Sequence, residues 1–590
     1  MAKVRIFTCI LALILGACSE PPADEPTKTV ESRVDRIASE YVDGYYSQFP
    51  EEVYEIGYPD APMDRFGDHA KESTAAWNAR VDNWLAELSG IDPSSVSSAA
   101  TALTYVFTRA QMQALVDRRV CQQDLWNISP TWTGWQYMVA STLAIQPVDT
   151  PDQRADALAR IGDIARYVKT EVNNLRRGQD QGYTAGANNV AAVIDQVSSL
   201  IETPTTESPF YSPASRADDE KFITAYTEVL ESDVHDAMIA YRDFLANDYQ
   251  GHDGPGVGAN PDGARCYEAS VRFWASSSMA PEEIHRKGLS EMARIQSEML
   301  EIAKASFGTD DVRALLSELR DNPEYTFASE QEMLDTITAA VERGKAAVGD
   351  WFGYVPEAGL RIVQSPAYEK DSGGGFYSVG LADGSRPGIY TVGTYNPTAI
   401  SKAGPESTAF HESYPGHHLQ MTVALRNESA HPIFRYITVS GTVEGWALYT
   451  ERLADEMGLY SSDLARLGML SNEAYRAARL VIDPGMHVMG WTRDEAIQYM
   501  LDHTTESRGS VESEIDRYSA VPGQATSYLI GSLEIQRLRK RAEEELGDDF
   551  DIREFHDRIL AAGGVTLPML GATIESWINH AKSPSEPSPE

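Results

Sequence analysis

The sequence contains little cysteine. Only four cysteines occur in 590 residues, Cys9, Cys18, Cys121 and Cys266, and no two of them form a C-x-x-C pair. Cysteine zinc sites are built from such closely spaced pairs. Their absence argues against a zinc site made of cysteines.

Positive charge is also scarce. The chain has 50 Lys and Arg residues against 88 Asp and Glu residues, which gives a formal net charge of −38 at pH 7. A surface this acidic repels phosphate groups, so we expect no nucleic-acid partner and no membrane contact beyond a lipid anchor. The charge indicates solubility and says nothing about the charge of a substrate.

Long hydrophobic runs are absent except at the N-terminus. A basic start precedes an apolar run at residues 6–15, which is too short to span a bilayer and is typical of a targeting segment. The run ends in L-G-A-C at residues 15–18, which resembles a bacterial lipobox. We therefore expect a signal peptide at residues 1–17 and a lipidated N-terminal residue at Cys18.

The residues after this segment indicate the cellular location of the protein. Ser19 follows Cys18 where an aspartate would stand in inner-membrane lipoproteins, which resembles an outer-membrane address. An ordinary secretory signal is the alternative. Residues 18–30, rich in proline and acidic residues, are predicted to be a flexible tether. We expect a lipid-anchored protein of the bacterial cell envelope.

Two cysteines remain for the folded part of the chain. Cys9 leaves with the signal peptide and Cys18 carries the lipid, so Cys121 and Cys266 are left. Outside the cytoplasm two such cysteines can pair. We expect a Cys121–Cys266 disulfide, with two isolated buried thiols as the alternative.

The remaining composition indicates a large folded protein made mainly of helices. Of all residues, 42% are hydrophobic and 9% aromatic, and the chain is long enough for a large core. Apolar residues recur at spacings of three and four in residues 77–88, 154–175 and 218–245, which is typical of amphipathic helices. Pro281 is predicted to open another long helix.

These patterns suggest a division of the chain into regions. We expect an N-terminal helical region at residues 31–250, a region carrying the chemistry at 251–578, and a disordered tail rich in Pro, Ser and Glu at 579–590.

Histidine is scarce as well, and its distribution is uneven. Three of the 12 histidines occur with a glutamate in H-E-S-Y-P-G-H-H at residues 411–418. Imidazole is the commonest zinc donor, and a carboxylate beside a ligating histidine, here Glu412, is the usual general base of a zinc hydrolase. The regular motif H-E-x-x-H is absent, because Pro415 occupies the position of the second histidine.

An unbroken helix would not bring a second histidine close to His411. In such a helix His417 would lie about 9 Å along the axis on nearly the opposite side, and His418 about 10.5 Å away on the same face. Pro415 cannot bond to the carbonyl of His411, and Gly416 tolerates unusual dihedrals. A kink or bulge there would bring a later histidine back beside His411. The alternative is a polar helix surface with ordinary histidines.

A second string, E-G-W-A-L-Y-T-E at residues 444–451, can complete a metal site. A catalytic zinc has three protein ligands, often His, His and Glu. Glu444 follows His417 by 27 residues, enough for a helix to end and an antiparallel helix to return. Glu451, two turns further on, could orient a histidine. An isolated glutamate on a helix is usually only solvated, but this pairing favours Glu444 as a ligand.

Three further polar residues recur at four-residue steps. They are Arg479, Asp483 and His487, and Pro484-Gly485 is expected to break the helix between them. They form either a structural ion pair or a group that supports the metal ligands. His487 is accordingly a candidate catalytic residue.

Together, H-E-x-x-P-G-H-H-L-Q and E-G-W-A-L-Y-x-E resemble a bacterial family catalogued as a domain of unknown function. More distantly they resemble gluzincin metallopeptidases such as thimet oligopeptidase and angiotensin-converting enzyme, where a downstream Glu completes H-E-x-x-H. The close resemblance covers about residues 260–575. It implies Zn²⁺ as cofactor, with His411 and Glu444 as ligands.

The two-residue insertion leaves the second histidine ligand open. In relatives a glycine often precedes the second histidine, as Gly416 precedes His417, which favours His417. The phase of an unbroken helix favours His418 instead, although Pro415 argues against an unbroken helix. We expect His417 to be the ligand and His418 to turn toward a carboxylate or the substrate.

The resemblance also suggests residues around the metal. Related gluzincin peptidases carry tyrosines in a Gly-rich segment after the zinc ligands that hydrogen-bond the oxyanion. By this similarity Tyr528 is the candidate, with Tyr518 second, and a buried structural tyrosine is the alternative for each. Strand-like residues 373–379 and 388–393 flank a turn and predict a hairpin. In gluzincin-like folds such an edge pairs with an extended peptide, and a lid hairpin is the alternative.

We therefore expect a large, mainly α-helical, cleft-forming fold with a small sheet beside the zinc helix. The expected function is zinc-dependent hydrolysis of peptide bonds in short or unstructured peptides. Glu412 would take a proton from water and pass it to the leaving amine. A hydrolase of a non-peptide amide and a lipid-anchored binding protein are the alternatives. The oligomeric state stays open.

Overall fold

The fold is described from a computed structural model of the whole chain. It describes residues 29–53, 57–365, 375–381, 384 and 386–582. The predicted signal peptide, the lipidation site Cys18 and nearly all of the predicted tether lie outside these residues. Within them, no helix is both long and apolar enough to cross a membrane.

The protein is mainly α-helical, as predicted, and its N-terminal part is a series of helices. The periodic segments at residues 77–88 and 154–175 lie within helices, and so do residues 220–245 of the segment 218–245. The helices are α1 (Val30–Gln48), α3 (Lys71–Ser89), α4 (Ala99–Arg118), α5 (Trp135–Ile145), α6 (Pro151–Gln181), α7 (Ala187–Glu202), α8 (Ser212–Arg216), α9 (Glu220–Val229), α10 (His235–Asn247) and α11 (Gly263–Ala275).

Helices also make up most of the C-terminal part, where Pro281 opens α12 as predicted. They are α12 (Pro281–Ile302), α13 (Val312–Asp321), α14 (Glu330–Ala347), α15 (Pro405–Glu412), α16 (His417–Arg426), α17 (Ile433–Tyr436), α18 (Ser440–Glu456), α19 (Asp463–Val488), α20 (Arg493–His503), α21 (Arg508–Ala520), α22 (Ser527–Leu546), α23 (Ile552–Ala561) and α24 (Leu567–Lys582).

The longest helix, α6, shows how local sequence sets the helix ends. Thr150 and Gln153 form a reciprocal capping box, and Pro151 occupies the first turn, where its missing N–H costs nothing. At the other end Gly182 adopts a left-handed conformation with φ 81°, which a side chain would disfavour.

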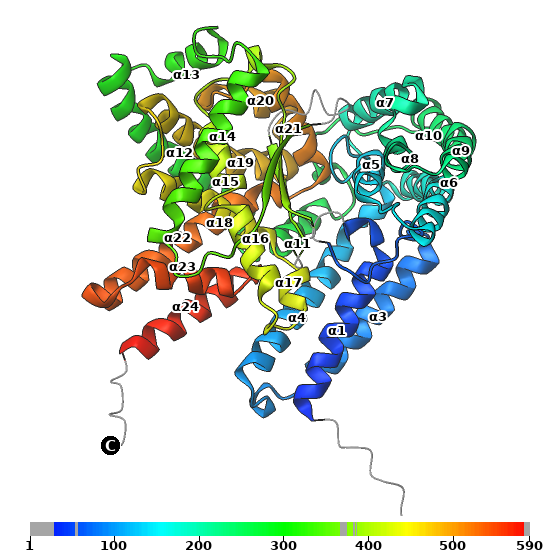
Figure 1. Cartoon of the computed structure of the whole chain (residues 1–590), viewed down its shortest axis with the longest axis horizontal. Helices are drawn as coiled ribbons and strands as arrows, with labels where there is room; N and C mark the ends of the chain where they lie inside the picture. The colour runs from blue at the N-terminus through cyan, green and yellow to red at the C-terminus, as the bar shows by residue number, and fades with distance from the viewer. Residues whose placement is uncertain (1–28, 54–56, 366–374, 382–383, 385, 583–590) are drawn as a thin grey trace, which may run out of the picture.

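A small three-stranded sheet contains the predicted hairpin. Its strands are β1 (Leu360–Gln364), β2 (Gly375–Ser378) and β3 (Gly388–Val392), in the order β1-β3-β2. β2 and β3 pair antiparallel, which confirms the hairpin, and β1 pairs parallel with β3. Residues 382, 383 and 385 of the turn between β2 and β3, and residues 373–374 of the predicted hairpin, lie outside the described residues. In Figure 1 the sheet lies in the middle of the molecule, beside α15 and α16.

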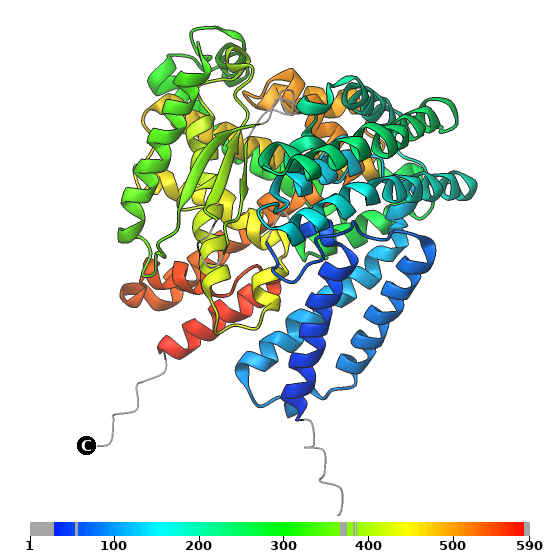
Figure 2. The same ribbon diagram turned by 45° about the vertical axis from the view of Figure 1, so that its right-hand side comes forward.

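Several hydrophobic cores hold the helices together. One core joins the first helices of the chain, through side chains such as Tyr41 and Trp77, to α18 through Trp446 and to α24 through Trp577. A second core lies within α5 to α10, and a third surrounds α19. The views in Figures 1 and 2 show α1, α3 and α4 as one group and α5 to α10 as another, next to the C-terminal part. Both ends of the described chain therefore contribute to one core.

The disulfide between Cys121 and Cys266 is present. It links the turn after α4 to α11, two segments separated by 145 residues, and both cysteines are 1% exposed.

Two helix ends differ from the expectations. α19 continues through Pro484-Gly485 to Val488, so the predicted break is wrong. Its last turns are buried on all sides, and packing of this kind outweighs the hydrogen bond that proline removes. The predicted tail at residues 579–590 begins too early, because α24 extends to Lys582. Trp577 and Ile578 are buried and hold this end of α24 in the core.

A histidine between two buried carboxylates connects the end of α1 to α6. His69 lies 3.1 Å from Glu51 and 3.4 Å from Glu171, and these two glutamates are 1% and 3% exposed. Burial disfavours the imidazolium, but the hydrogen bonds to Glu171 and Glu51 outweigh it and raise the pKa of His69 to about 10. Since this pKa exceeds the ordinary value of 6.5, the stabilisation is complete below pH 6.5 and is lost as the pH rises through 10.

The replacement His69→Gln should therefore destabilise the protein in a pH-dependent way. It leaves two buried carboxylates without their cation, which costs roughly 3–5 kcal/mol. We expect this loss at pH 6 and a much smaller one at pH 10, measured by urea denaturation of wild type and variant. His580→Gln, on the exposed end of α24, serves as control. Equal losses at both pH values would contradict this assignment.

Candidate metal centre

The segment from His411 to His418 folds as two helices with a break between them. α15 ends at Glu412 and α16 begins at His417. Between them Ser413 has φ −117° and ψ −108°, Gly416 has φ −77° and ψ −134°, and the Tyr414–Pro415 peptide bond is cis. In place of the expected kink, the helix is completely interrupted. The interruption compensates for the two inserted residues that would otherwise keep His411 and His417 apart.

Gly416 allows the chain to fold back over the end of α15. Its N–H donates to the carbonyl of Phe410 at 3.1 Å, and a Cβ atom at this position would lie only 1.9 Å from the carbonyl oxygen of His411. Only glycine fits so close an approach of two backbone segments. The indole Nε1 of Trp446, on α18, donates to the carbonyl of Pro415 at 3.1 Å and fixes the break from the other side.

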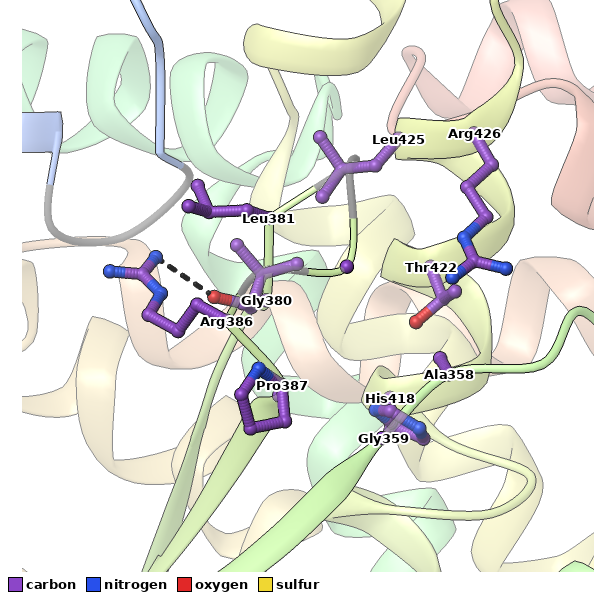
Figure 3. A pocket seen from close by; sticks show the side chains of 13 residues that line it. Ala358, Gly359, Gly380, Leu381, Arg386, Pro387, His418, Thr422, Leu425 and Arg426 are labelled. Atoms are coloured by element: carbon purple, nitrogen blue, oxygen red, sulfur yellow. Dashed lines mark hydrogen bonds between the residues drawn. The ribbon is translucent and has the colours of Figure 1, made fainter.

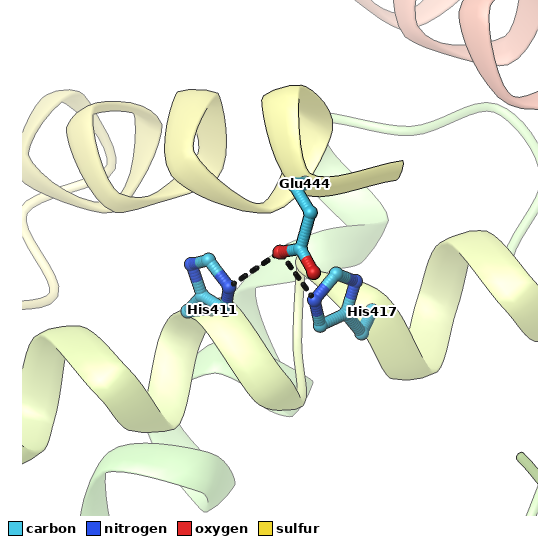
Figure 4. A group of neighbouring side chains, drawn as sticks. All are labelled: His411, His417 and Glu444. Atoms are coloured by element: carbon cyan, nitrogen blue, oxygen red, sulfur yellow. Dashed lines mark ion pairs between the residues drawn. The ribbon is translucent and has the colours of Figure 1, made fainter. Parts of the chain in front are cut away.

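The break brings His411 and His417 together at Glu444. The Nε2 atoms of His411 and His417 lie 3.5 and 3.4 Å from the same Oε2 atom of Glu444. One ligand atom from each of the three residues lies within 4.8 Å of the others. Figure 4 shows both rings directed at this carboxylate from opposite sides. The sequence prediction named these three residues, and the structure brings them together.

Close helix packing places Glu444 at this point. α18 crosses α22 where glycines face each other: a Cβ on Gly531 would lie 1.7 Å from the carbonyl oxygen of Gly441, and one on Gly445 would lie 2.5 Å from the Cα of Gly531. The crossing thus carries Glu444, the neighbour of Gly445, and Tyr528, one turn before Gly531, to the same region.

Glu451 orients His411, as predicted. Its Oε1 lies 2.9 Å from Nδ1 of His411, and its Oε2 accepts a hydrogen bond from Ser407. Burial disfavours the charged form of Glu451, but Arg476, 3.7 Å away, and His411 outweigh it and hold the pKa of Glu451 below its ordinary value. The carboxylate holds a proton on Nδ1 of His411, so Nε2 is the nitrogen that faces Glu444 and would bind a metal ion.

The charges around His411, His417 and Glu444 favour binding of a cation. Burial disfavours a charged His411, yet hydrogen bonds to Glu444 and Glu451 raise the pKa of His411 to about 9. Burial likewise works against the carboxylate of Glu444, but His411 and His417 hold its pKa well below the ordinary range. The carboxylates thus draw positive charge to this point.

The donor set fits zinc. Bonds of about 2.0–2.1 Å at tetrahedral angles place two ligand atoms about 3.3 Å apart. The observed separations of 3.4 and 3.5 Å between the imidazole nitrogens and Glu444 are close to this value. Two imidazoles and one carboxylate are also a common ligand set of catalytic zinc. His417 Nδ1 is buried and has no hydrogen-bond partner among the described residues. No hydrogen bond among these residues therefore prevents a small rotation of the ring toward a metal ion.

Glu412 lies directly beside this cluster. Its side chain is 7% exposed, and burial, with a smaller contribution from Glu444, raises the pKa of Glu412. Its charge also acts on Tyr390 of the central strand β3, so the sheet adjoins the site. A carboxylate in this position can accept a proton from a group held at the three ligands.

Tyr528 contacts the cluster and Tyr518 does not. The Tyr528 ring lies 6.5 Å from that of His411, nearly parallel to it, and the guanidinium of Arg479 lies 4.3 Å from the Tyr528 ring centre. Burial raises the pKa of Tyr528. Tyr518 is fully buried, and its hydroxyl accepts a hydrogen bond from Arg479 at 2.7 Å. Among the described contacts, Tyr518 therefore reaches the site only through Arg479.

His487 has a structural position. Its Nδ1 accepts a hydrogen bond from the backbone N–H of Val257 at 2.9 Å, and its Nε2 lies 3.1 Å from the carbonyl of Tyr518. It is 1% exposed and, in the part of the chain that the structure describes, has no contact with His411, His417 or Glu444.

The three residues spaced by four do not form one group. Asp483 accepts hydrogen bonds from Tyr267 and from the backbone N–H of Gly523 and lies 3.5 Å from His487, whereas Arg479 pairs with Glu514. The unbroken α19 places all three on one face, but Arg479 turns to Glu514 on α21 and leaves Asp483 to pair with His487.

His418 faces away from Glu444. Its Nδ1 lies 3.0 Å from the hydroxyl of Tyr377 and its Nε2 lies 3.0 Å from the hydroxyl of Tyr414. Burial lowers the pKa of His418 to about 4, with smaller contributions from nearby cations. It is therefore a neutral side chain held by two tyrosines and not by the carboxylate that was one of the two expectations for it.

Sequence reasoning did not identify Ser407 and Arg476, which hold Glu451. Ser407 lies four residues before His411, one helical turn away, and this spacing is a usable signal. No local pattern singles out Arg476, since it reaches Glu451 from a different helix.

Comparison with known proteins gives a family and a fold. The family model described as bacterial protein of unknown function (DUF885) matches residues 50–574. A candidate lipoprotein from Colwellia psychrerythraea has a similar solved structure, with a TM-score of 0.85 and 25% sequence identity, covering 94% of this chain and 100% of that one. A candidate lipoprotein of unknown function from Shewanella oneidensis has a TM-score of 0.68 and 17% identity, covering 92% and 99%. No curated protein matches the sequence.

Alanine replacements should separate the roles of the adjacent histidines. His417→Ala and Glu444→Ala each remove one of three ligands, so zinc content should fall from about one ion per chain to near zero. His418→Ala should keep its zinc, because its ring nitrogens lie 3.0 Å from the hydroxyls of Tyr377 and Tyr414 and not beside Glu444. Zinc is measured by mass spectrometry of the metal after equal dialysis. An empty His418→Ala protein beside a loaded His417→Ala protein would reverse the assignment.

Gly416→Ala should also abolish zinc binding, although it removes no ligand. The new Cβ would meet the carbonyl of His411 at 1.9 Å, so the two histidines must separate. Gly162→Ala is the matched control, because a Cβ there meets nothing within 4 Å. Both variants are compared by thermal melting and zinc content. Normal zinc content in Gly416→Ala would show that the break tolerates a side chain.

Proposed function

The chain belongs to the DUF885 family of bacterial proteins, and we propose that it is a zinc-dependent peptidase. The observation that carries the proposal is the convergence of His411, His417 and Glu444 at tetrahedral ligand spacing with Glu412 directly beside them. Zinc hydrolases use this combination of two imidazoles, a carboxylate ligand and a neighbouring carboxylate base.

The residues of the site have distinct parts in the proposed reaction. When bound, zinc would polarise the scissile carbonyl and lower the pKa of a water molecule. The carboxylate of Glu412 accepts the proton of that water and delivers it to the nitrogen of the leaving amine. Glu451 keeps His411 in the Nδ1–H tautomer throughout, so that Nε2 stays available. Tyr528 donates its hydroxyl hydrogen to the oxygen that gains negative charge.

Tyr528 suits the role of hydrogen-bond donor to this oxygen because its hydroxyl keeps its proton. Burial raises its pKa, so the hydroxyl is protonated at neutral pH and can donate. Arg479 stacks on its ring and in turn pairs with Glu514 at 2.9 Å, which holds the tyrosine against α19.

We further propose that the protein acts at the cell envelope on short or unstructured peptides. The lipobox-like string at residues 15–18 and the likeness to two candidate lipoproteins support a lipid anchor at Cys18. An anchored peptidase of this kind would meet peptides outside the cytoplasm. The outer membrane is the location that Ser19 favours.

The direct test is incubation of the purified protein with a defined peptide library, with small non-peptide amides in parallel, and mass spectrometry of the products. Cleavage of peptides should stop with a zinc chelator and return with added zinc. Cleavage of the amides alone would contradict a peptidase, and absence of any hydrolysis by the zinc-loaded protein would contradict a hydrolase.

Glu412→Gln should keep the metal and lose turnover. The amide preserves the shape of the side chain but cannot accept the proton, so kcat should fall about 10²–10⁴-fold. Zinc content should equal that of wild type, because Glu412 is not a ligand. Glu428→Gln, an exposed glutamate just beyond α16, is the control. A Glu412→Gln protein with most of its rate would remove Glu412 from this role.

A further inference from the structure

A pocket lies between the β2–β3 hairpin and α16. Residues near the end of the hairpin, including Leu381 and Arg386, line one side, and His418, Thr422 and Arg426 line the other. Figure 3 shows Thr422 and Arg426 projecting from α16, with Leu381 and Arg386 across from them. The pocket is therefore bounded by the same helix that supplies His417.

The wall formed by α16 is a regular stripe. His418, Thr422 and Arg426 are spaced by four residues, so they lie on one face of the helix. His417 is rotated by about 100° from His418 and belongs to the neighbouring face. One helix thus presents a metal ligand on one face and a polar stripe on the next.

The pocket contains two arginines, Arg386 and Arg426. Among the described residues, neither Arg386 nor Arg426 forms an ion pair, although the chain has 88 acidic residues. Arg386 donates Nη2 to the carbonyl of Val379 at 3.2 Å, and burial lowers its pKa. A half-buried guanidinium without a carboxylate is costly, and an anion in the pocket would offset that cost.

His418 does not take part as a charged group. Tyr377 and Tyr414 occupy both of its ring nitrogens, so it forms a neutral end of the pocket. The positive charge comes from the arginines, and Thr422, whose hydroxyl hydrogen-bonds with Tyr377, lies beside Arg426.

The pocket lies within reach of a short peptide from the metal ligands. Nine residues separate His417 and Arg426, about 13.5 Å along the helix axis. Helical side chains point back toward the N-terminus, which brings the guanidinium of Arg426 nearer to His417. An extended peptide advances about 3.3 Å per residue, so two to four residues cover this distance.

We propose that Arg426, with Arg386 across the pocket, binds the C-terminal carboxylate of the peptide substrate. This proposal rests on the peptidase function and adds to it that the enzyme releases short C-terminal fragments. Arginine suits the task because its planar fork donates two parallel hydrogen bonds to one carboxylate. Leu381 and Leu425, which also line the pocket, provide an apolar surface for the last side chain.

Binding of matched peptides tests the proposal without turnover. The probes are an acetylated peptide of four alanines and a final leucine, the same peptide with a C-terminal amide, and an amide that ends in glutamate. Calorimetry on zinc-loaded Glu412→Gln protein gives their Kd values. The free acid should bind roughly 10–100-fold more tightly than its amide, as expected for a charge-assisted hydrogen-bonded pair.

Variants in the same background assign this preference to the pocket. Arg426→Gln should reduce the ratio of acid to amide affinity toward one, and Arg426→Lys, which keeps the charge but not the fork, should retain an intermediate ratio. Arg265→Gln, at an arginine whose side chain is 73% exposed, should leave the ratio unchanged. Thermal melting confirms that each variant is folded.

The outcomes distinguish this proposal from the peptidase function. Equal affinity for acid and amide, or an unchanged ratio in folded Arg426→Gln and Arg426→Lys, would overturn it even if peptides are cleaved. Tight binding of the glutamate-ending amide alone would also overturn it, because the bound group would then be a side chain. An acid preference that depends on Arg426 would support the pocket even if Glu412 proved not to be the base.

Discussion

The contact between Gly416 and the carbonyl of His411 is the constraint on which the metal centre depends. It ends one helix and starts the next within four residues, so His411 and His417 face the same carboxylate instead of opposite sides of one helix. The hydrogen bond from Trp446 to Pro415 holds this break against α18, the helix that also carries Glu444. The break and the third residue of the cluster are therefore fixed by the same packing.

Glycine has a second positioning role where α18 crosses α22. Without side chains at Gly441, Gly445 and Gly531 the two backbones meet directly, and the crossing brings Glu444 and Tyr528 toward His411. Larger residues would push the helices apart and move both functional side chains. The site thus depends on several close backbone contacts more than on any one large side chain.

The electrostatics of the site follow from the carboxylates that surround two histidines. Glu412, Glu444 and Glu451 crowd around two histidines at low exposure, and the pKa of His411 rises to about 9 because the carboxylates attract positive charge. A divalent cation would satisfy the same demand with stronger bonds. The proposed anion pocket at Arg426 is positively charged, whereas the metal centre is rich in carboxylates. α16 contributes residues to both sites. A peptide could thus be held by its carboxylate while its scissile bond lies near the histidines.

Spacing, periodicity and counting within the chain predicted the helical class, the hairpin, the Cys121–Cys266 pair and the cluster of His411 and Glu412 with a distant Glu444. Features that depend on packing between distant segments became visible only in the folded chain. His417 rather than His418 faces Glu444 because Gly416 packs on His411 and Trp446 holds the break. α19 passes through Pro484 because burial on all sides outweighs a local preference, and Tyr528 rather than Tyr518 lies beside His411 because α22 crosses α18 at its glycines.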